Sequence, residues 1–215
     1  MGVLHLIRHG QASFGAADYD VLSDIGHRQS EALGRWFAAQ GVVPDLVAHG
    51  GMRRQRETLE GIMGQLSGAP QPLIHPGLGE FDFKALLAAR GPSDEDPQDR
   101  KAHFRRLRDT VLMWQRGEIA DPPESWPAFA ARVEDARQAL TQSDGTVIAV
   151  SSGGAIGQMV SAALGAPPVT QIEVQLQTRN ASVTRFAFST RRCFLNGFNE
   201  TPFVTGADDP LLTYS

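Results

Sequence analysis

Short apolar runs alternate along the chain with longer segments in which apolar residues recur every three or four positions. The short runs are typical of buried strands and lie at 3–7, 45–50 and 146–150. The longer segments have the period of a helix and lie at 22–41, 53–66 and 126–140. Strands that alternate with helices predict an α/β fold, a three-layer α/β/α sandwich with a mostly parallel central sheet.

The last third of the chain has a different pattern. "TQIEVQLQ" (170–177) alternates apolar and polar residues, and "SVTRFAFS" (182–189) and "RRCFLNGF" (191–198) follow it. Alternation of this kind is typical of half-buried strands, so we expect strands at the edge of the sheet here. Their exposed faces could pair between two subunits, which would make the protein a homodimer.

Residues 84–125 interrupt the regular pattern. Two polar, Pro-rich connectors flank a helical stretch, "RKAHFRRLRDTVLMWQRG". We interpret 1–215 as one domain with a helical insertion, or cap, at about 84–125 that packs on the main sheet. The basic residues of this helix either help to hold an anionic substrate or form a solvated face; they are Lys101, Arg105, Arg106 and Arg108.

Composition narrows the function classes. The net charge is −4 and the pI about 5.8, which argues against a nucleic-acid-binding protein. No apolar run is long enough to span a bilayer, and the N-terminus lacks the pattern of a signal peptide. The single cysteine, Cys193, excludes an intrachain disulfide. We therefore expect a cytoplasmic protein in which Cys193 is a small buried apolar side chain.

Polar residues cluster where the predicted strands end. In open α/β sheets, ligands bind beyond the carboxyl ends of the strands. Arg8 and His9 follow the first strand, residues 49–54 the second, "LGEFD" (78–82) the third and "SSGG" (151–154) the fourth. Arginines, small hydroxyls, glycines and a carboxylate together suit a phosphoryl group.

The helix predicted at 53–66 begins with three arginines, Arg53, Arg54 and Arg56. Positive charge at a helix N-terminus opposes the helix dipole. Each arginine alone is best interpreted as a solvated helix end, whereas the group indicates an anion site. An imidazole next to it can attack phosphorus while neutral, and a nearby carboxylic acid can protonate the leaving oxygen. The sequence has no ligand spacing typical of a metal site, so we expect no metal and no cofactor.

The motifs resemble those of the histidine phosphatase superfamily, the phosphoglycerate mutase-like fold. "LIRHGQ" (6–11) is similar to its first motif, and "LSDIGHRQSEALG" (22–34) is similar to the helix after it. "VAHGGMRRQRETL" (47–59) resembles the family pattern "LxRAxxTA", and "LGEFDF" (78–83) resembles the segment that carries its acid. "NASVTRFAF" (180–188) and "LNGFNE" (195–200) resemble its late strand and C-terminal turn.

The resemblance implies a role for each matching residue. His9 would be the nucleophile, Arg8 and Arg54 would bind phosphate, and Glu80 would be the general acid and base, with Asp82 as the alternative. Gln11 and Ser13 follow the first motif and would line the pocket, and Ser152 and Gly153 would bind phosphate at a helix N-terminus.

One departure from the family pattern concerns activity. Where the family has "VsHGg", with its second core histidine, this chain has "AVSSGG", with Ser152. A serine donates one hydrogen bond but carries no charge, and losing a charged donor costs on the order of a hundredfold in rate. His49 lies in another loop at the same edge as a substitute, although a loop histidine is more often solvated.

Three functions remain open at this point. The first is a metal-independent phosphomonoesterase that works through phosphohistidine at His9 on a small phosphorylated metabolite. The second is a regulatory or binding protein of the same fold that holds a phosphate ion or phosphorylated ligand with little turnover. The third is a phosphoglycerate mutase or a phosphoprotein phosphatase.

Overall fold

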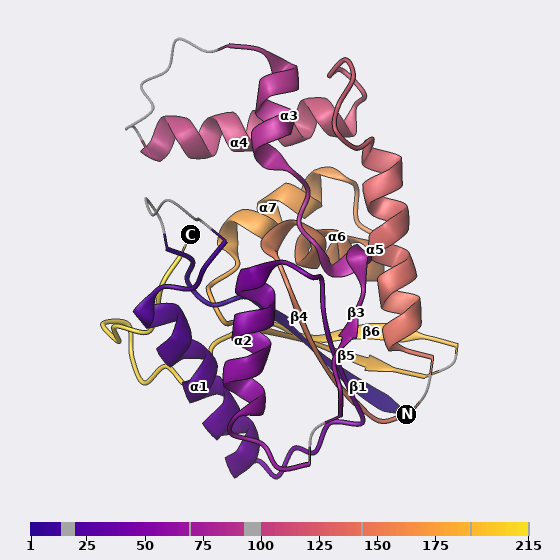
Figure 1. Ribbon diagram of the computed structural model, residues 1–215. Helices are drawn as coiled ribbons and strands as arrows, with labels where there is room; N and C mark the ends of the chain where they lie inside the picture. The colour runs from indigo at the N-terminus through magenta and orange to yellow at the C-terminus, as the bar shows by residue number, and fades with distance from the viewer. Residues whose placement is uncertain (14–19, 69, 93–99, 143, 190, 215) are drawn as a thin grey trace.

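The computed structural model describes residues 1–13, 20–68, 70–92, 100–142, 144–189 and 191–214. Its centre is a six-stranded sheet with the order β3-β2-β4-β1-β5-β6 (Figure 1). The strands are β1 (Gly2–Arg8), β2 (Leu46–His49), β3 (Leu73–Ile74), β4 (Thr146–Ser151), β5 (Val183–Phe188) and β6 (Cys193–Glu200). The first four strands are parallel, and β5 and β6 add antiparallel pairings. The predicted mostly parallel sheet is confirmed.

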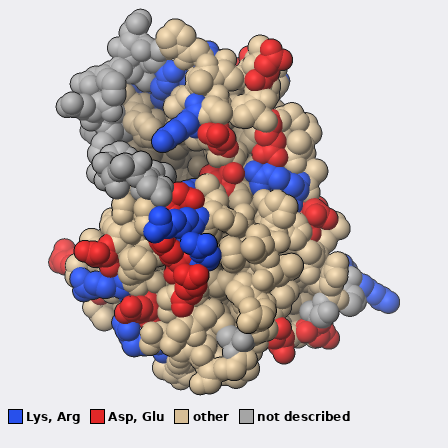
Figure 2. Space-filling view, in the orientation of Figure 1, with Lys and Arg blue, Asp and Glu red and all other residues tan. Residues whose placement is uncertain are grey.

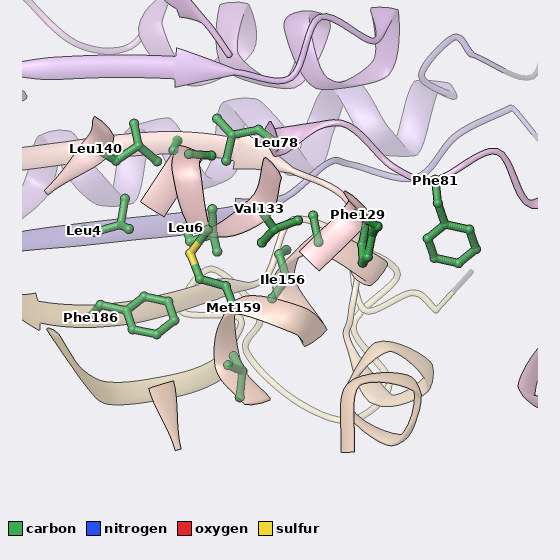
Figure 3. Close-up of a cluster of buried hydrophobic side chains, with 14 of the residues drawn as sticks. Leu4, Leu6, Leu78, Phe81, Phe129, Val133, Leu140, Ile156, Met159 and Phe186 are labelled. Atoms are coloured by element: carbon green, nitrogen blue, oxygen red, sulfur yellow. The ribbon is translucent and has the colours of Figure 1, made fainter. Parts of the chain in front are cut away.

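Helices cover both faces of the sheet (Figure 1). On one face lie α1 (Asp24–Ala39) and α2 (Arg53–Met63), and on the other lie α5 (Trp126–Leu140) and α6 (Gly153–Ala163). Because side chains alternate along a strand, β1 contributes side chains to two hydrophobic cores, one on each face of the sheet. Leu4 and Leu6 pack with Ile156 of α6 (Figure 3), whereas Ile7 packs with residues of α1 and α2. The predicted three-layer arrangement is confirmed.

The segment 170–177 is a helix, so the prediction of a strand there is wrong. It belongs to α7 (Val169–Gln177), which begins directly after Pro167 and Pro168. Proline is well tolerated at a helix start. The side chain of Gln171 is buried and donates to Gly154 O at 3.3 Å and to Gln175 Oε1 at 2.8 Å. Gln171 and Gln175, spaced i and i+4, both lie against α6, and this packing overrides the period-two alternation.

The region that we interpret as an insertion forms helices that pack chiefly on other helices rather than on the sheet. It contains α3 (Phe83–Arg90), which follows the short 3-10 turn η1 (Pro76–Leu78), and α4 (Arg100–Gln115). In Figure 1 both helices lie beyond α7. The buried Trp114 joins α4 to the main core through Phe81 and Phe129, with ring centroids 5.1 and 5.3 Å apart.

Two of the basic residues of α4 bind neighbouring elements. Arg108 binds Glu173 of α7 at 2.8 Å, and Arg106 donates to Gly91 O at 2.8 Å. Arg105 is exposed, and the Lys101 side chain lies outside the described residues. Arg106 and Arg108 thus fasten α4 to its neighbours. Within the described ranges, no helix combines the length and apolarity needed to cross a membrane.

Candidate active site

His9 lies directly beyond β1, at the carboxyl edge of the sheet, and its side chain is buried. Its Nδ1 lies 2.8 Å from Gly10 O, so Nδ1 carries the hydrogen and donates it to that carbonyl. Nε2 then carries a lone pair, which accepts a hydrogen bond from Arg54 Nε at 3.1 Å. Burial, followed by the charges of Arg54 and Arg8, holds the pKa of His9 well below its usual value. The site therefore holds a neutral imidazole whose Nε2 lone pair is directed at Arg54.

Arg54 is presented by the first turn of α2 and is almost fully buried. Its Nη1 binds Asp20 Oδ1 at 2.7 Å. Asp20 also accepts a hydrogen bond from the backbone N–H of Arg53 at 2.9 Å, so its carboxylate places negative charge at the N-terminus of α2. No pattern in the sequence indicated this role for Asp20, because an aspartate outside the motifs carries no distinctive spacing.

Of the three arginines at the start of α2, Arg54 is the one that contacts His9. Arg53 pairs with Glu57 at 2.7 Å, and Arg56 pairs with Glu60 at 3.5 Å, both with side chains about half exposed. Positive and negative residues lie next to one another over this helix in Figure 2. Of these three arginines, Arg54 is therefore the candidate to bind an anion beside His9.

Arg8, the last residue of β1, faces the opposite side of the sheet from His9. Its Nη1 donates to Thr178 O, directly after α7. A Cβ on Gly153 would lie 3.7 Å from Arg8 Nε, which places the guanidinium beside the N-terminus of α6. Arg8 and Arg54 therefore approach the His9 region from the two faces of the sheet.

Glu80 lies at the N-terminus of α6. Its Oε2 accepts from Gly154 N at 2.9 Å, and its Oε1 accepts from Phe81 N at 3.1 Å. Burial raises the pKa of Glu80, while the Gly154 N–H and the charges of Arg54 and Arg8 oppose that rise. Any Cβ at position 154 would overlap Glu80 Oε1, so this approach requires glycine. A carboxyl group whose pKa is raised keeps its proton to higher pH, which fits a proton donor.

Asp82 is placed differently. Its side chain is exposed, and Oδ1 accepts from Ala85 N at 2.9 Å as the N-cap of α3. The sequence left two candidates, Glu80 and Asp82, for the general acid. In the structure Glu80 lies near Arg54 and Arg8, whereas Asp82 caps a helix.

Ser152 and Gly153 begin α6, with Ser152 as its fully buried N-cap residue. Parallel pairing places Arg8 opposite Ser151, and His9 N donates to Ser151 O at 3.0 Å. Ser152 is extended, so His9 and Ser152 project from the same face of neighbouring strands. The Ser152 Oγ accepts from Gln55 Nε2 at 2.9 Å. Gln55 was missed by sequence reasoning, although its place next to Arg54 was a usable signal.

Two other predicted residues have side-chain partners outside the His9–Arg54 pair. Gln11 Oε1 accepts from Ser23 Oγ at 2.9 Å, so the Gln11 side chain is turned toward the N-cap of α1. His49 lines a separate hollow with Arg56, Glu60 and other residues of α2, and its Nδ1 accepts from Gly51 N at 3.0 Å. His49 therefore does not stand in for a second imidazole beside His9.

Ser13 is also turned away from the site. Its Oγ donates to Leu22 O at 3.1 Å, next to the start of α1. In the part of the chain that the structure describes, no three His, Cys, Asp or Glu side chains gather as a metal site would require.

Comparison with known proteins places this geometry in a family. Residues 4–201 match the model of the histidine phosphatase superfamily, branch 1. No curated protein sequence gave a significant match.

Solved structures share the fold at low identity. A phosphoserine phosphatase from Entamoeba histolytica, in complex with phosphoserine, is 19% identical with a TM-score of 0.67, and 94% of this chain and 99% of that chain are covered. A mycobacterial glucosyl-3-phosphoglycerate phosphatase with inorganic phosphate is 21% identical with a TM-score of 0.69, covering 95% and 100%. A phosphoglycerate mutase from Bacillus anthracis is 16% identical with a TM-score of 0.66, covering 94% of each chain. The chain belongs to the histidine phosphatase superfamily.

Proposed function

We propose that this protein is a metal-independent phosphomonoesterase that forms a phosphohistidine at His9. The observation that carries the proposal is the His9 ring itself. It is buried and neutral, its Nδ1 is held by Gly10 O, and its Nε2 faces Arg54. A nucleophile with this tautomer needs no separate base. Phosphatases and a mutase share the fold, which fits phosphoryl transfer.

In the first step, His9 Nε2 forms a bond to phosphorus and the bond between phosphorus and the ester oxygen breaks. The phosphoryl oxygens take over the Arg54 Nε–H, which frees the Nε2 lone pair. Arg54 and Arg8 balance the negative charge of the phosphoryl group. Glu80, in its acid form, gives its proton to the leaving alkoxide.

In the second step, a water oxygen bonds to phosphorus and the bond to Nε2 breaks. The Glu80 carboxylate takes the proton of that water, so inorganic phosphate leaves and both His9 and Glu80 return to their starting forms. Mutase action would require the phosphoenzyme to be kept for a second acceptor, and we rank it below hydrolysis. A phosphoprotein substrate is ranked lower still, because α3 and α4 stand over α7 beside the site.

Ser152 favours a second candidate function, phosphate binding with little turnover. Ser152 contributes a hydroxyl and no charge where the family pattern has histidine. This alternative predicts saturable binding of a phosphorylated metabolite without release of inorganic phosphate.

The test is release of phosphate from an aryl phosphate and from a panel of phosphorylated metabolites. We expect His9→Ala to lower kcat/KM by a factor on the order of 10³ or more. The matched control is Cys193→Ser, which replaces the half-buried thiol of β6 and should leave kcat/KM unchanged. Equal turnover by the wild type and His9→Ala would exclude His9 as the nucleophile, and binding without release would favour the second function.

A further inference from the structure

Gln55 is a buried glutamine on α2, next to Arg54. Its Nε2 donates to Leu78 O at 3.0 Å and to Ser152 Oγ at 2.9 Å. Its Oε1 lies 3.4 Å from Met52 N, which donates to it. A carbonyl such as Leu78 O only accepts, so the amide nitrogen must face it and the orientation of the amide is fixed.

This orientation decides which way the Ser152 hydroxyl acts. Because the Gln55 N–H points at Ser152 Oγ, that oxygen is an acceptor in this contact and its own hydrogen is available for donation. Ser152 is the N-cap residue of α6 but makes no side-chain cap bond. Among the described residues, no acceptor receives its hydroxyl hydrogen. The buried hydroxyl is thus held as a donor on the face of the sheet where His9 lies.

We infer that Gln55 is a positioning residue, which aims the Ser152 O–H at a phosphoryl oxygen held between His9 and Arg54. The inference rests on the proposed function and concerns the same site. Two consecutive residues of α2 position the two groups, because Arg54 contacts His9 and Gln55 contacts Ser152. The donor is neutral, since neither an amide nor an alcohol titrates near neutral pH, and it takes the place of a charged imidazole.

A purely structural role for Gln55 makes a different prediction. Gln55 would then join α2 to Leu78, and its loss would act through stability alone. Leu78 O also accepts from Ser151 Oγ at 2.7 Å, so this carbonyl keeps a partner when the amide is removed. Gln55→Met preserves the length of the side chain and removes its hydrogen bonds, which makes it a suitable variant.

The first experiment is a double-mutant cycle on turnover of an aryl phosphate, with Gln55→Met, Ser152→Ala and the double variant. We expect each single variant to lower kcat/KM about tenfold, and the double variant to be no worse than Ser152→Ala, because both act through one hydroxyl. Gln138→Met, an exposed glutamine on α5, is the matched control and should keep full turnover. Losses that multiply to about a hundredfold in the double variant, or a Gln55→Met that keeps full turnover, would overturn the inference.

The second experiment asks whether Gln55 occupies the space that an imidazole at position 152 would need. Ser152→His alone should be no more active than the wild type, because the Gln55 amide lies 2.9 Å from the Ser152 oxygen. Ser152→His with Gln55→Ala should exceed Ser152→His at least about tenfold. It should also add an ionisation near the ordinary histidine pKa to its pH profile. Equal activity of these two variants would show that the positions are not coupled.

A measurement of phosphate binding separates failure of this inference from failure of the proposed function. If the wild type releases no phosphate, the same cycle is measured by calorimetric titration with inorganic phosphate. Non-additive loss of affinity in Gln55→Met and Ser152→Ala would support the inference for a binding protein. Additive or absent loss would overturn it.

Discussion

The two ends of this sheet both carry arginines, a glutamate and a titratable side chain, yet they are organised in opposite ways. At the carboxyl end, Arg54 contacts a neutral His9, and burial raises the pKa of Glu80. At the other end, a cavity of about 760 Å³ is lined by Glu134, Arg137, Arg191, Arg192 and Cys193, with other residues. There Arg137 binds Glu134 through two contacts, at 2.5 and 2.7 Å.

Helix direction accounts for much of this difference. The N-termini of α2 and α6 lie at the His9 end and favour anions, whereas the last residues of α5 and α6 line the far cavity and favour cations. Arg137 lowers the pKa of Glu134, and burial raises the pKa of the Cys193 thiol. Arg137 binds Glu134 through Nε and Nη2, which leaves it little charge for a ligand, whereas Arg54 binds Asp20 through Nη1 and still directs its Nε at His9. We conclude that a phosphate site is not defined by the number of its arginines. It is defined by the groups that those arginines face.

The sharpest test of this comparison replaces the glutamate at each end. Glu80→Gln removes the proton donor and should lower kcat on an alkyl phosphate by about 10³-fold. The loss should be smaller on an aryl phosphate, whose leaving group needs less protonation. Glu134→Gln should leave kcat unchanged, because its charge only neutralises Arg137. Similar losses from both variants would contradict the contrast between the two ends.

The pH profile of Glu80→Gln provides the accompanying control. The proposed mechanism requires a neutral His9 and a protonated Glu80. Activity on an alkyl phosphate should rise with pH through the lowered pKa of His9 and fall through the raised pKa of Glu80. Glu80→Gln should lose the descending limb, while Glu134→Gln should keep both limbs. A descending limb that persists in Glu80→Gln would assign it to another group.

A second prediction separates burial of a histidine from its function. His5 lies on β1, four residues before His9, against Phe37 of α1, with ring centroids 5.1 Å apart. Burial, helped by Arg185 and opposed by Glu200, lowers the pKa of His5 to about 4. The unfolded chain takes up a proton near pH 6.5 and the folded protein only near pH 4, so stability falls as the pH falls across this range. The loss amounts to about 3 kcal/mol below pH 4.

His5→Phe should remove this dependence, and it keeps an aromatic ring against Phe37. His5 Nδ1 has no hydrogen-bond partner within the described residues, so the variant breaks no such bond there. The free energy of unfolding, measured by denaturant titration at pH 7 and pH 4, should fall less in the variant than in the wild type. Turnover should be unchanged, because His5 lacks the arginine contact of His9. An unchanged acid sensitivity would show that His5 does not carry it.

The fold was predictable from the sequence where every local pattern in a segment favoured the same secondary structure. β1 and β4 are short, largely apolar runs, and α1 (Asp24–Ala39) lies within the predicted helical segment 22–41. The segment 170–177 shows the limit, because its alternation suits a strand, whereas the two prolines before it and its glutamines suit a helix packed on α6. Such a conflict is decided by tertiary packing, which local periodicity does not contain.

The charged residues of the candidate site were predictable from the sequence, whereas the contacts between their side chains were not. Strand ends indicated Arg8 and His9, and the clash of arginines with a helix dipole indicated the start of α2. That Arg54 reaches His9 while Arg56 pairs with Glu60 depends on which way each residue of α2 faces. The Gln55–Ser152 contact joins residues 97 positions apart, and no short-range pattern records it.

Asp82 gives the smallest expected effect and tests whether closeness in sequence to Glu80 suffices for catalysis. Asp82 caps α3 through Ala85 N, so Asp82→Ala should cost about 1 kcal/mol of unfolding free energy. Ser125→Ala, which removes the corresponding cap of α5, is a matched control with a similar cost. Neither variant should change kcat/KM, measured beside denaturant unfolding. If Asp82→Ala loses turnover as Glu80→Gln does, Asp82 supplies the proton, and the exposed carboxylate must then reach the site in the substrate complex.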